Sequence, residues 1–463
     1  MARRFLSPVL VLVLLVVLAT AGVAAEPAKP AAEKEDYYEL QKLLVETMDE
    51  VERNYVKDIS RRELIEAAIQ GVLKKLDPYS SYIRPDEFES FRSSVESEYG
   101  GIGIKLDIDN GELKVVSPLA GTPAYRAGLL AGDRIVEIDG KSTEEITMDD
   151  AVKRLKGEEG TKVTLVVVHE HQAEKETVTI TREVIHVATV LGDHRKDDGS
   201  WDFMLDSEKR IGYIRITAFS RNTVGELRDA LARLVAMNIR ALILDLRFNP
   251  GGLLPSAVEV CDLFIADGRI VSTKGRNVEE RTWNARKEGT FQGFSMTVLV
   301  NRYSASASEI VAACLQDHKR ALIVGERTWG KGSVQNVIEM ENGRSALKLT
   351  TASYHRPSGE NIHRFPGARE SDRWGVVPDK GYDLKLTDAE MSALLQDRRQ
   401  RDLVLPKPSS ETTPPVAGTA ALGGDGEPQE PELLAASGET NVVDPQLRMA
   451  LEYLSGELAR AEP

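Results

Sequence analysis

Three short segments of this chain carry residues that could do chemistry, and each directly follows an apolar run typical of a buried strand. The first segment is SASAS at 304–308, which opens a helical pattern after the run 296–300. A serine at a strand-to-helix turn exposes its hydroxyl beside backbone N–H groups, which suits a nucleophile. The same run is typical of a helix N-cap, and it favours none of Ser304, Ser306 and Ser308 over the others.

The second segment is Gly330-Lys331-Gly332, which follows the apolar run 321–324. Glycines on both sides of a lysine indicate that other backbone approaches it closely. A lysine acts as a general base only in its neutral form, and burial in an apolar pocket lowers its pKa. A solvated lysine in a turn is the alternative interpretation.

The third segment is DLRFNPGG at 245–252, again between an apolar run and a helical pattern. Its two glycines, Gly251 and Gly252, have backbone amides that could stabilise an oxyanion. A phosphate-binding loop is the alternative, but the segment lacks the Lys-Ser/Thr ending of such a loop.

The elements that carry these segments alternate between strand and helix from residue 209 onward. The pattern predicts strands at 211–216, 241–246, 296–300 and 321–324, with helices at 223–237, 253–265 and 306–315 between them. The strand at 211–216 shows apolar alternation, and the strand at 241–246 is a continuous apolar run. Alternating β segments follow at 332–354. This succession predicts an α/β layer around a largely buried sheet, with a β-rich addition.

Ahead of this region, residues 98–183 consist of short strands and glycine turns. The order of YGGIGI at 99–104, AGL, GDRI and IDG resembles a PDZ domain. The resemblance implies that the loop of Gly101, Ile102, Gly103 and Ile104 offers backbone N–H groups to a peptide's C-terminal carboxylate, and that the following edge strand pairs with the peptide. A tight loop between strands is the alternative.

The chain begins with the layout of a secretory signal peptide over residues 1–25. Arg3 and Arg4 precede the apolar run 9–18, and small residues at 23 and 25 suit a cleavage site. The run is shorter than the roughly 20 residues of a spanning helix. The chain is therefore predicted to be exported to the bacterial periplasm or cell envelope. An uncleaved N-terminal membrane anchor is the alternative, and any other membrane association would be peripheral.

Helical patterns flank the chain at both ends. A pair of helices is predicted within 26–97, the second opened by a capping box of Ser60 and Glu63. Residues 406–438 are rich in Pro, Gly, Thr, Ala and Glu and are predicted to be a disordered linker. A detached amphipathic helix within 439–463 usually covers a partner surface. We expect these terminal helices to serve self-association or docking of an adaptor protein.

Composition narrows the classes of partner. The net charge of −14 argues against nucleic acid, because phosphate binding needs a basic face. The histidines show no metal-ligand spacing, so neither a metal nor a cofactor is predicted. Cys261 and Cys314 each lie in an apolar helical pattern, and we interpret them as small core residues. A disulfide between them is the alternative in an exported chain.

Taken together, these motifs resemble the carboxy-terminal processing (tail-specific) proteases, a family of PDZ-containing serine peptidases with a Ser/Lys pair. The resemblance spans residues 37–379 and rests on YGGIGI, DLRFNPGG, SASASE, GERTWGKGSVQ and GVVPD in that order. It implies that Ser306 is the nucleophile, Lys331 its general base and Gln335 the group that holds the lysine. It also implies an oxyanion hole from the Ala307 N–H and an amide of Gly251 or Gly252.

Two departures from the family pattern stand out. Where family members often carry an arginine that links PDZ docking to the protease core, this chain has Lys156, and the segment 363–373 has the character of a charged insertion.

The resulting hypothesis is a multidomain α+β and α/β protein. Its predicted parts are a signal peptide (1–25), an N-terminal helical region (26–97), a PDZ domain (98–185), a serine protease core with a β-rich cap (186–405), a linker (406–438) and a C-terminal helix (439–463). The resemblance implies an exported, PDZ-gated serine endopeptidase that cleaves unstructured polypeptides near a free C-terminus. The alternatives are a non-catalytic PDZ-containing peptide-binding scaffold on the same fold and a peptidase in which a histidine replaces the lysine as base.

Overall fold

The computed structural model describes residues 36–170, 174–196, 198–403 and 443–461. The chain forms two compact units, residues 1–72 and 73–463, which are taken separately below. The predicted signal peptide (1–25) and the predicted linker (406–438) lie outside the described residues.

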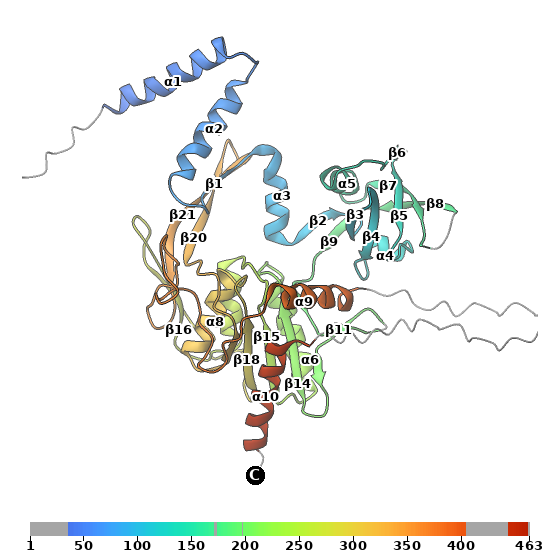
Figure 1. Cartoon of the computed structure of the whole chain (residues 1–463), viewed down its shortest axis with the longest axis vertical. Coiled ribbons are helices and arrows are strands. Elements are labelled where there is room, and N and C mark those ends of the chain that lie inside the picture. The colour runs from blue at the N-terminus through green and yellow to red at the C-terminus, as the bar shows by residue number, and fades with distance from the viewer. Residues whose placement is uncertain (1–35, 171–173, 197, 404–442, 462–463) are drawn as a thin grey trace, which may run out of the picture. The chain divides into compact units, whose positions relative to one another are not determined.

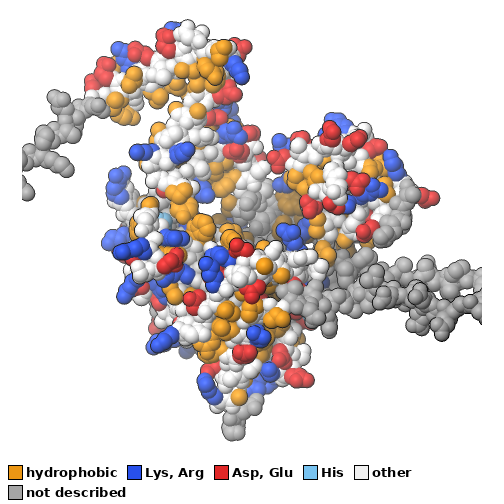
Figure 2. Space-filling model, viewed as in Figure 1, with side chains coloured by type: hydrophobic (Ala, Val, Ile, Leu, Met, Phe, Trp, Pro, Cys, Tyr) orange, Lys and Arg blue, Asp and Glu red, His pale blue; other side chains and the backbone are white. Residues whose placement is uncertain are grey.

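The described part of the first unit, from residue 36, is helical. Helix α1 (Tyr37–Asn54) is followed by α2 (Arg61–Lys74), whose last residues belong to the second unit. The predicted capping box is confirmed, because the Ser60 N–H donates to Glu63 Oε2 at 2.8 Å and the Glu63 N–H donates to Ser60 Oγ at 3.2 Å. Helix α1 buries none of its residues, and hydrophobic side chains lie open on this region (Figure 2). Among the helices of the described ranges, none is both long and apolar enough to cross a bilayer.

The second unit begins with a connector that leads into a small β domain. The connector consists of β1 (Ser81–Ile83), α3 (Pro85–Glu96) and β2 (Glu98–Gly101), which pairs with β9 (Glu183–His186). The sheet of the domain has the order β3-β4-β5-β7-β8, and β6 pairs with β5. The bounds are β3 (Ile104–Asp109), β4 (Glu112–Pro118), α4 (Pro123–Arg126), β5 (Arg134–Ile138), β6 (Lys141–Ser142), α5 (Met148–Leu155), β7 (Lys162–Val168) and β8 (Lys175–Thr181). Strand β3 is the edge of this sheet.

The protease region is built on a six-stranded sheet of order β10-β14-β15-β18-β19, with β13 beside β14. The four consecutive strands from β14 to β19 in this order are parallel to one another. The bounds are β10 (Val190–Leu191), β13 (Met204–Asp206), β14 (Ile211–Ile216), β15 (Ala241–Asp245), β18 (Ser295–Val300) and β19 (Leu322–Gly325). The small hairpin of β11 (His194–Arg195) and β12 (Trp201–Asp202) stands beside it.

Helices cover both faces of this sheet. On one face, side chains such as Leu244 and Val298 pack against α6 (Thr223–Ala236), α7 (Leu254–Asp262) and α8 (Ala307–Asp317). On the other face, Ile243 and its neighbours pack against α10 (Pro445–Arg460). The alternation predicted for 211–216 does not mark an exposed face, because every residue of β14 is buried between these two layers.

A second, antiparallel sheet stands beside the first. Its order is β1-β21-β16-β17, and β20 pairs with β21 on the other side. The bounds are β16 (Arg269–Gly275), β17 (Arg281–Asn284), β20 (Ser333–Met340) and β21 (Ser345–His355). Strand β20 is an edge strand whose residues 336–340 are exposed.

The C-terminal helix has a partner within its own chain, and this corrects the prediction that it serves another subunit or an adaptor. Helix α10 lies against β15, β18 and β19 (Figure 1). Ala450, Leu454 and Leu458 are buried against the sheet. Its apolar side is therefore used inside the second unit. Helix α9 (Asp388–Arg401) precedes it in the chain.

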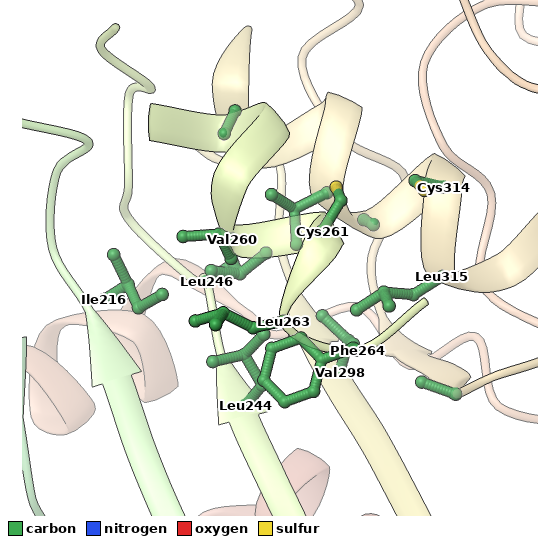
Figure 3. Close-up of a cluster of buried hydrophobic side chains, with 14 of the residues drawn as sticks. Ile216, Leu244, Leu246, Val260, Cys261, Leu263, Phe264, Val298, Cys314 and Leu315 are labelled. Carbon is green, nitrogen blue, oxygen red and sulfur yellow. The ribbon is translucent and has the colours of Figure 1, made fainter. Parts of the chain in front are cut away.

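Both cysteines are buried free thiols. Cys261 and Cys314 lie on α7 and α8 among apolar side chains such as Leu244 and Phe264 (Figure 3). Burial raises the pKa of the Cys261 thiol, and the neighbouring Cys314 acts in the same direction. The interpretation as small core residues is confirmed.

Candidate active site

The three segments singled out in the sequence follow neighbouring parallel strands. The DLRFNPGG segment begins with the last residue of β15, the SASAS segment follows β18, and Gly330-Lys331-Gly332 follows β19. The carboxyl ends of parallel strands in one sheet meet at the same edge, where α/β proteins usually hold their sites. The topology therefore brings together segments that are 25 to 80 residues apart in the chain.

Hydrogen bonding distinguishes the three serines, which the sequence left equal. The hydroxyl of Ser304 donates to the Leu246 carbonyl at 2.8 Å, and that of Ser308 donates to the Asn249 carbonyl at 2.9 Å. Both side chains are completely buried. Among the described residues, the Ser306 hydroxyl donates to no carbonyl or carboxylate, and Ser306 lines a cavity of about 810 Å³. Of the three, Ser306 alone offers a hydroxyl to that cavity.

The backbone at Ser306 is unusual. This residue stands at the N-cap of α8 with φ +55° and ψ −111°, a conformation that non-glycine residues rarely adopt. Its N–H donates to Glu309 Oε2 at 2.8 Å, and its carbonyl accepts a bond from Tyr354 Oη at 3.0 Å. Strain of this kind persists only where the surroundings hold it.

Gly251 packs against Ser306 and Gly252 against Phe219, and the amides of the two glycines differ. The Gly251 N–H donates to Asn249 Oδ1 at 2.8 Å, so it is already engaged. Within the described part of the chain, the N–H groups of Gly252 and Ala307 have no acceptor. Both residues line the cavity beside Ser306. Gly252 and Ala307 are therefore the two residues whose amides can serve an oxyanion.

Close packing against the Ser306 turn requires a glycine at position 251. Its φ is +105°, and an added Cβ would lie 2.8 Å from Ser306 Cβ and 2.9 Å from Ala307 N. No side chain fits there without moving the Ser306 turn.

Lys331 lines the same cavity from the other side. Its Nζ donates to Gln335 Oε1 at 2.6 Å and to the Ser333 carbonyl at 3.4 Å, and it lies 5.2 Å from the centre of the Tyr79 ring. Gln335 in turn donates to Ser333 Oγ at 2.9 Å and to Thr350 Oγ1 at 3.1 Å. The predicted contact between Gln335 and the lysine is therefore present.

The lysine has a lowered pKa. Burial lowers the pKa of Lys331 to about 8, and the positive charge of Lys348 acts in the same direction. Lys348 lines the cavity as well. Although Ser306 and Lys331 share this cavity, the structure has no hydrogen bond between the Ser306 hydroxyl and Lys331 Nζ, both of which are described.

Glu309 joins the two sides of the site, a role that sequence reasoning missed. This completely buried carboxylate accepts bonds from the N–H groups of Ser306, Gly330 and Lys331 at 2.7–2.8 Å. Burial raises its pKa, although these donors act to lower it. The Ser-x-x-Glu spacing of 306–309 is a capping-box pattern and was the available signal. Tyr354 also joins the two sides, because its Oη donates to the carbonyls of Ser306 and Lys331. No pattern in the sequence indicated this role.

No described histidine lines this cavity. His363, from the charged segment 363–373, lies behind the lysine loop, where its Nδ1 accepts a bond from the Gly332 N–H at 3.3 Å. The segment therefore backs the lysine loop. Within the ranges that the structure covers, no cluster of His, Cys, Asp and Glu could hold a metal ion.

The predicted peptide-binding loop lies at the edge of the small β domain. Gly101 ends β2, Gly103 has φ +79° with its carbonyl bonded to Thr122 Oγ1 at 3.0 Å, and Ile104 begins the edge strand β3. The side chain of Ile102 is buried in the domain core, so only its backbone can face a ligand. Helix α5 flanks β3.

Comparisons with known proteins agree with this arrangement. Residues 210–379 match peptidase family S41, residues 114–168 match a PDZ domain, and residues 18–86 match the N-terminal domain of the activating protease CtpB. A carboxy-terminal-processing protease of Bartonella bacilliformis is 37% identical over 371 residues, covering 76% of this chain and 80% of the relative.

The chain belongs to the carboxy-terminal-processing proteases of peptidase family S41. A second relative of this family, from Synechocystis, is 34% identical over 333 residues and covers 70% of this chain and 73% of its own. Among solved structures, the photosystem II D1 C-terminal processing protease shares 28% identity with a TM-score of 0.42, covering 79% of this chain and 98% of its own. This carboxy-terminal-processing protease is thus a PDZ-containing serine peptidase.

Proposed function

We propose that this peptidase cleaves unstructured polypeptides near their C-termini through an acyl-enzyme on Ser306, with Lys331 as the general base. One observation carries the proposal. In a single cavity, the one hydroxyl of the three that donates to no buried carbonyl stands with a lysine whose pKa is lowered to about 8. A base with a pKa near the working pH is well suited to proton transfer.

The steps follow from these groups. Neutral Lys331 takes the proton of the Ser306 hydroxyl as Oγ attacks the carbonyl carbon of the substrate. The oxyanion of the tetrahedral intermediate accepts bonds from the N–H groups of Gly252 and Ala307. The lysine ammonium then gives its proton to the leaving amine, so the peptide C–N bond breaks and an ester on Ser306 remains. Lys331 next deprotonates a water that hydrolyses this ester.

We propose that this arrangement of Lys331 is a resting state. Its ammonium is bonded to Gln335 and the Ser333 carbonyl and not to Ser306, so the lysine side chain must turn to reach the hydroxyl. We propose that binding of substrate favours this movement. Gln335 then retains the lysine within reach of Ser306.

The PDZ domain is proposed to recognise the free C-terminal end of the substrate. Support comes from the loop of Gly101 to Ile104 and from the edge strand β3 beside α5, where an added peptide strand can pair. The proposed location is the bacterial periplasm or cell envelope, in keeping with the signal-peptide pattern of residues 1–25. The exposed apolar side chains of α1 support the N-terminal helices as the surface for self-association or an adaptor.

The test is degradation of an unfolded polypeptide, followed by mass spectrometry of the fragments. Wild-type protein should release fragments from the C-terminal part, and Ser306→Ala and Lys331→Ala should each lower the rate by roughly 10³-fold or more. A substrate whose C-terminus is amidated should be cleaved more slowly if the PDZ domain reads the free carboxylate. Cleavage by Ser306→Ala at the wild-type rate would refute the proposal, and activity of Lys331→Ala would point to another base.

A further inference from the structure

A buried network of charges connects the C-terminal helix to the loop that carries Gly251 and Gly252. Arg247 lies at its centre. Its guanidinium donates to Asp245 Oδ2 at 2.7 Å, to Asp444 Oδ2 at 2.7 Å and to Gln446 Oε1 at 3.0 Å. Arg398 of α9 also bonds to Asp245, which accepts a further bond from Tyr213 Oη at 2.8 Å. Asp444 and Gln446 belong to the start of α10.

The network is balanced in charge only when α10 is docked. Two carboxylates, Asp245 and Asp444, face two guanidinium groups, Arg247 and Arg398, and every side chain of the four is at most 8% exposed. Burial acts to raise the pKa of Asp444, but the Arg247 guanidinium outweighs it and holds that pKa below its usual value. Without Asp444, two buried cations would share one carboxylate, which is an unfavourable arrangement in a medium of low dielectric constant.

A short path runs from Arg247 to the amide proposed for the oxyanion. Phe248 follows Arg247 with φ +63°, and its N–H donates to Asn301 Oδ1 at 3.0 Å. The buried Asn249 comes next. Its side chain bonds the Gly251 N–H, and its carbonyl accepts bonds from the Ala305 N–H at 3.0 Å and the Ser308 hydroxyl. A shift of Arg247 would therefore displace both the Gly251-Gly252 turn and the Ser306 turn.

We propose that α10 is a positioning element of the active site, in which Asp444 neutralises Arg247 and thereby holds the Gly251-Gly252 turn in place for the transition state. The inference rests on the proposed function, because it takes the Gly252 amide as an oxyanion donor. Asp444 touches no substrate and acts through Arg247. The apolar sheet face and Arg247 together form a docking site for an amphipathic helix that begins with Asp-Pro-Gln, and α10 fills that site from beyond residue 442.

The substitution Asp444→Asn in the full chain separates the charge of Asp444 from its role as the N-cap of α10. Asp444 Oδ1 also accepts the Leu447 N–H at 3.0 Å as the N-cap of α10, and asparagine caps helices about as well as aspartate. The substitution therefore keeps the cap and removes the charge. Glu452→Gln is the matched control, since it removes one negative charge from an exposed position of the same helix.

The readouts are kcat and KM for a peptide substrate, and the inhibition constant of a peptide aldehyde, which forms a tetrahedral adduct with a serine. We expect Asp444→Asn to lower kcat at least tenfold, to leave KM within twofold and to weaken the aldehyde in parallel with kcat. Glu452→Gln should match wild type in all three. A lowered melting temperature with unchanged kcat and aldehyde affinity would show a purely structural role and would overturn the proposal.

A second experiment applies if Asp444→Asn fails to fold. A recognition site for a specific endoprotease is placed within 404–442, and the full chain is folded before it is cut. Removing the 443–463 peptide should lower kcat, and adding back the synthetic peptide should restore it, whereas the Asp444→Asn peptide should not. Unchanged kcat after removal would overturn the proposal. Failure of the proposed function is distinct, because Ser306→Ala would then remain active whatever α10 does.

Discussion

The two sides of the active-site cavity differ in how firmly they hold their groups. On the side of the parallel sheet, Asn249, Ser304 and Ser308 are completely buried and hydrogen-bonded around the Ser306 turn. On the opposite side, Lys331 is partly exposed and precedes the edge strand β20, whose outer residues are open to solvent. The Ser306 side is preorganised, whereas on the other side the Lys331 side chain can adjust while Glu309 holds its backbone. Activation of this peptidase is therefore expected to consist of movement of the lysine and not of the serine.

The largest effect is expected from a substitution that disturbs the rigid side. Gly251→Ala places a methyl group 2.8 Å from Ser306 Cβ, and the buried loops around it cannot yield. Because the methyl group also lies 2.9 Å from Ala307 N and displaces that amide, we predict that kcat/KM falls by roughly 10²–10³-fold, the usual effect of losing an oxyanion donor. Gly289→Ala is the matched control, because Gly289 also has a positive φ, +79°, but has open space around it. Equal activity of the two variants would mean that the serine side is not rigid.

A smaller effect is expected on the adjustable side. Lys348→Met removes a positive charge that lowers the pKa of Lys331, so that pKa should rise from about 8. Because the proposed base is the neutral lysine, the midpoint of the pH–rate profile should move to higher pH, by less than about one pH unit. Activity should fall at pH 7 and approach that of wild type near pH 10.

The control for this measurement is Lys287→Met, an exposed lysine that is not among the residues lining the cavity. If the midpoint of the pH–rate profile does not move in Lys348→Met, or moves equally in the control, the prediction is wrong. The pH dependence of activity would then not report the ionisation of Lys331.

Local sequence patterns predicted most of the elements, because the apolar periodicity of a strand or a helix can be recognised from consecutive residues. The strands at 241–246 and 296–300 and the helix at 306–315 occur within two residues of their predicted bounds. The packing of β14 was less evident. Its apolar alternation marks one buried face, but α10 returns from the far end of the chain to cover the other.

The active site likewise has features that local motifs predicted and features that depend on contacts between distant residues. The motifs placed Ser306, Lys331 and the glycine turn in separate loops, and their order after three strands was readable. What selects Ser306 over Ser304 and Ser308 is a set of bonds to the carbonyls of Leu246 and Asn249, which lie more than 50 residues away. Glu309 and Tyr354 depend on equally distant contacts. Likewise, the apolar side of α10 predicted a partner surface without identifying it.

The most direct test of the central claim is the rate at which an organophosphonate labels the enzyme, followed by peptide mapping. We predict one adduct, on Ser306, with a labelling rate that rises with pH around a midpoint near 8 and is at least about 100-fold lower in Lys331→Ala. An adduct on Ser304 or Ser308, or an unchanged rate in Lys331→Ala, would contradict the assignment of Ser306 as a nucleophile activated by Lys331.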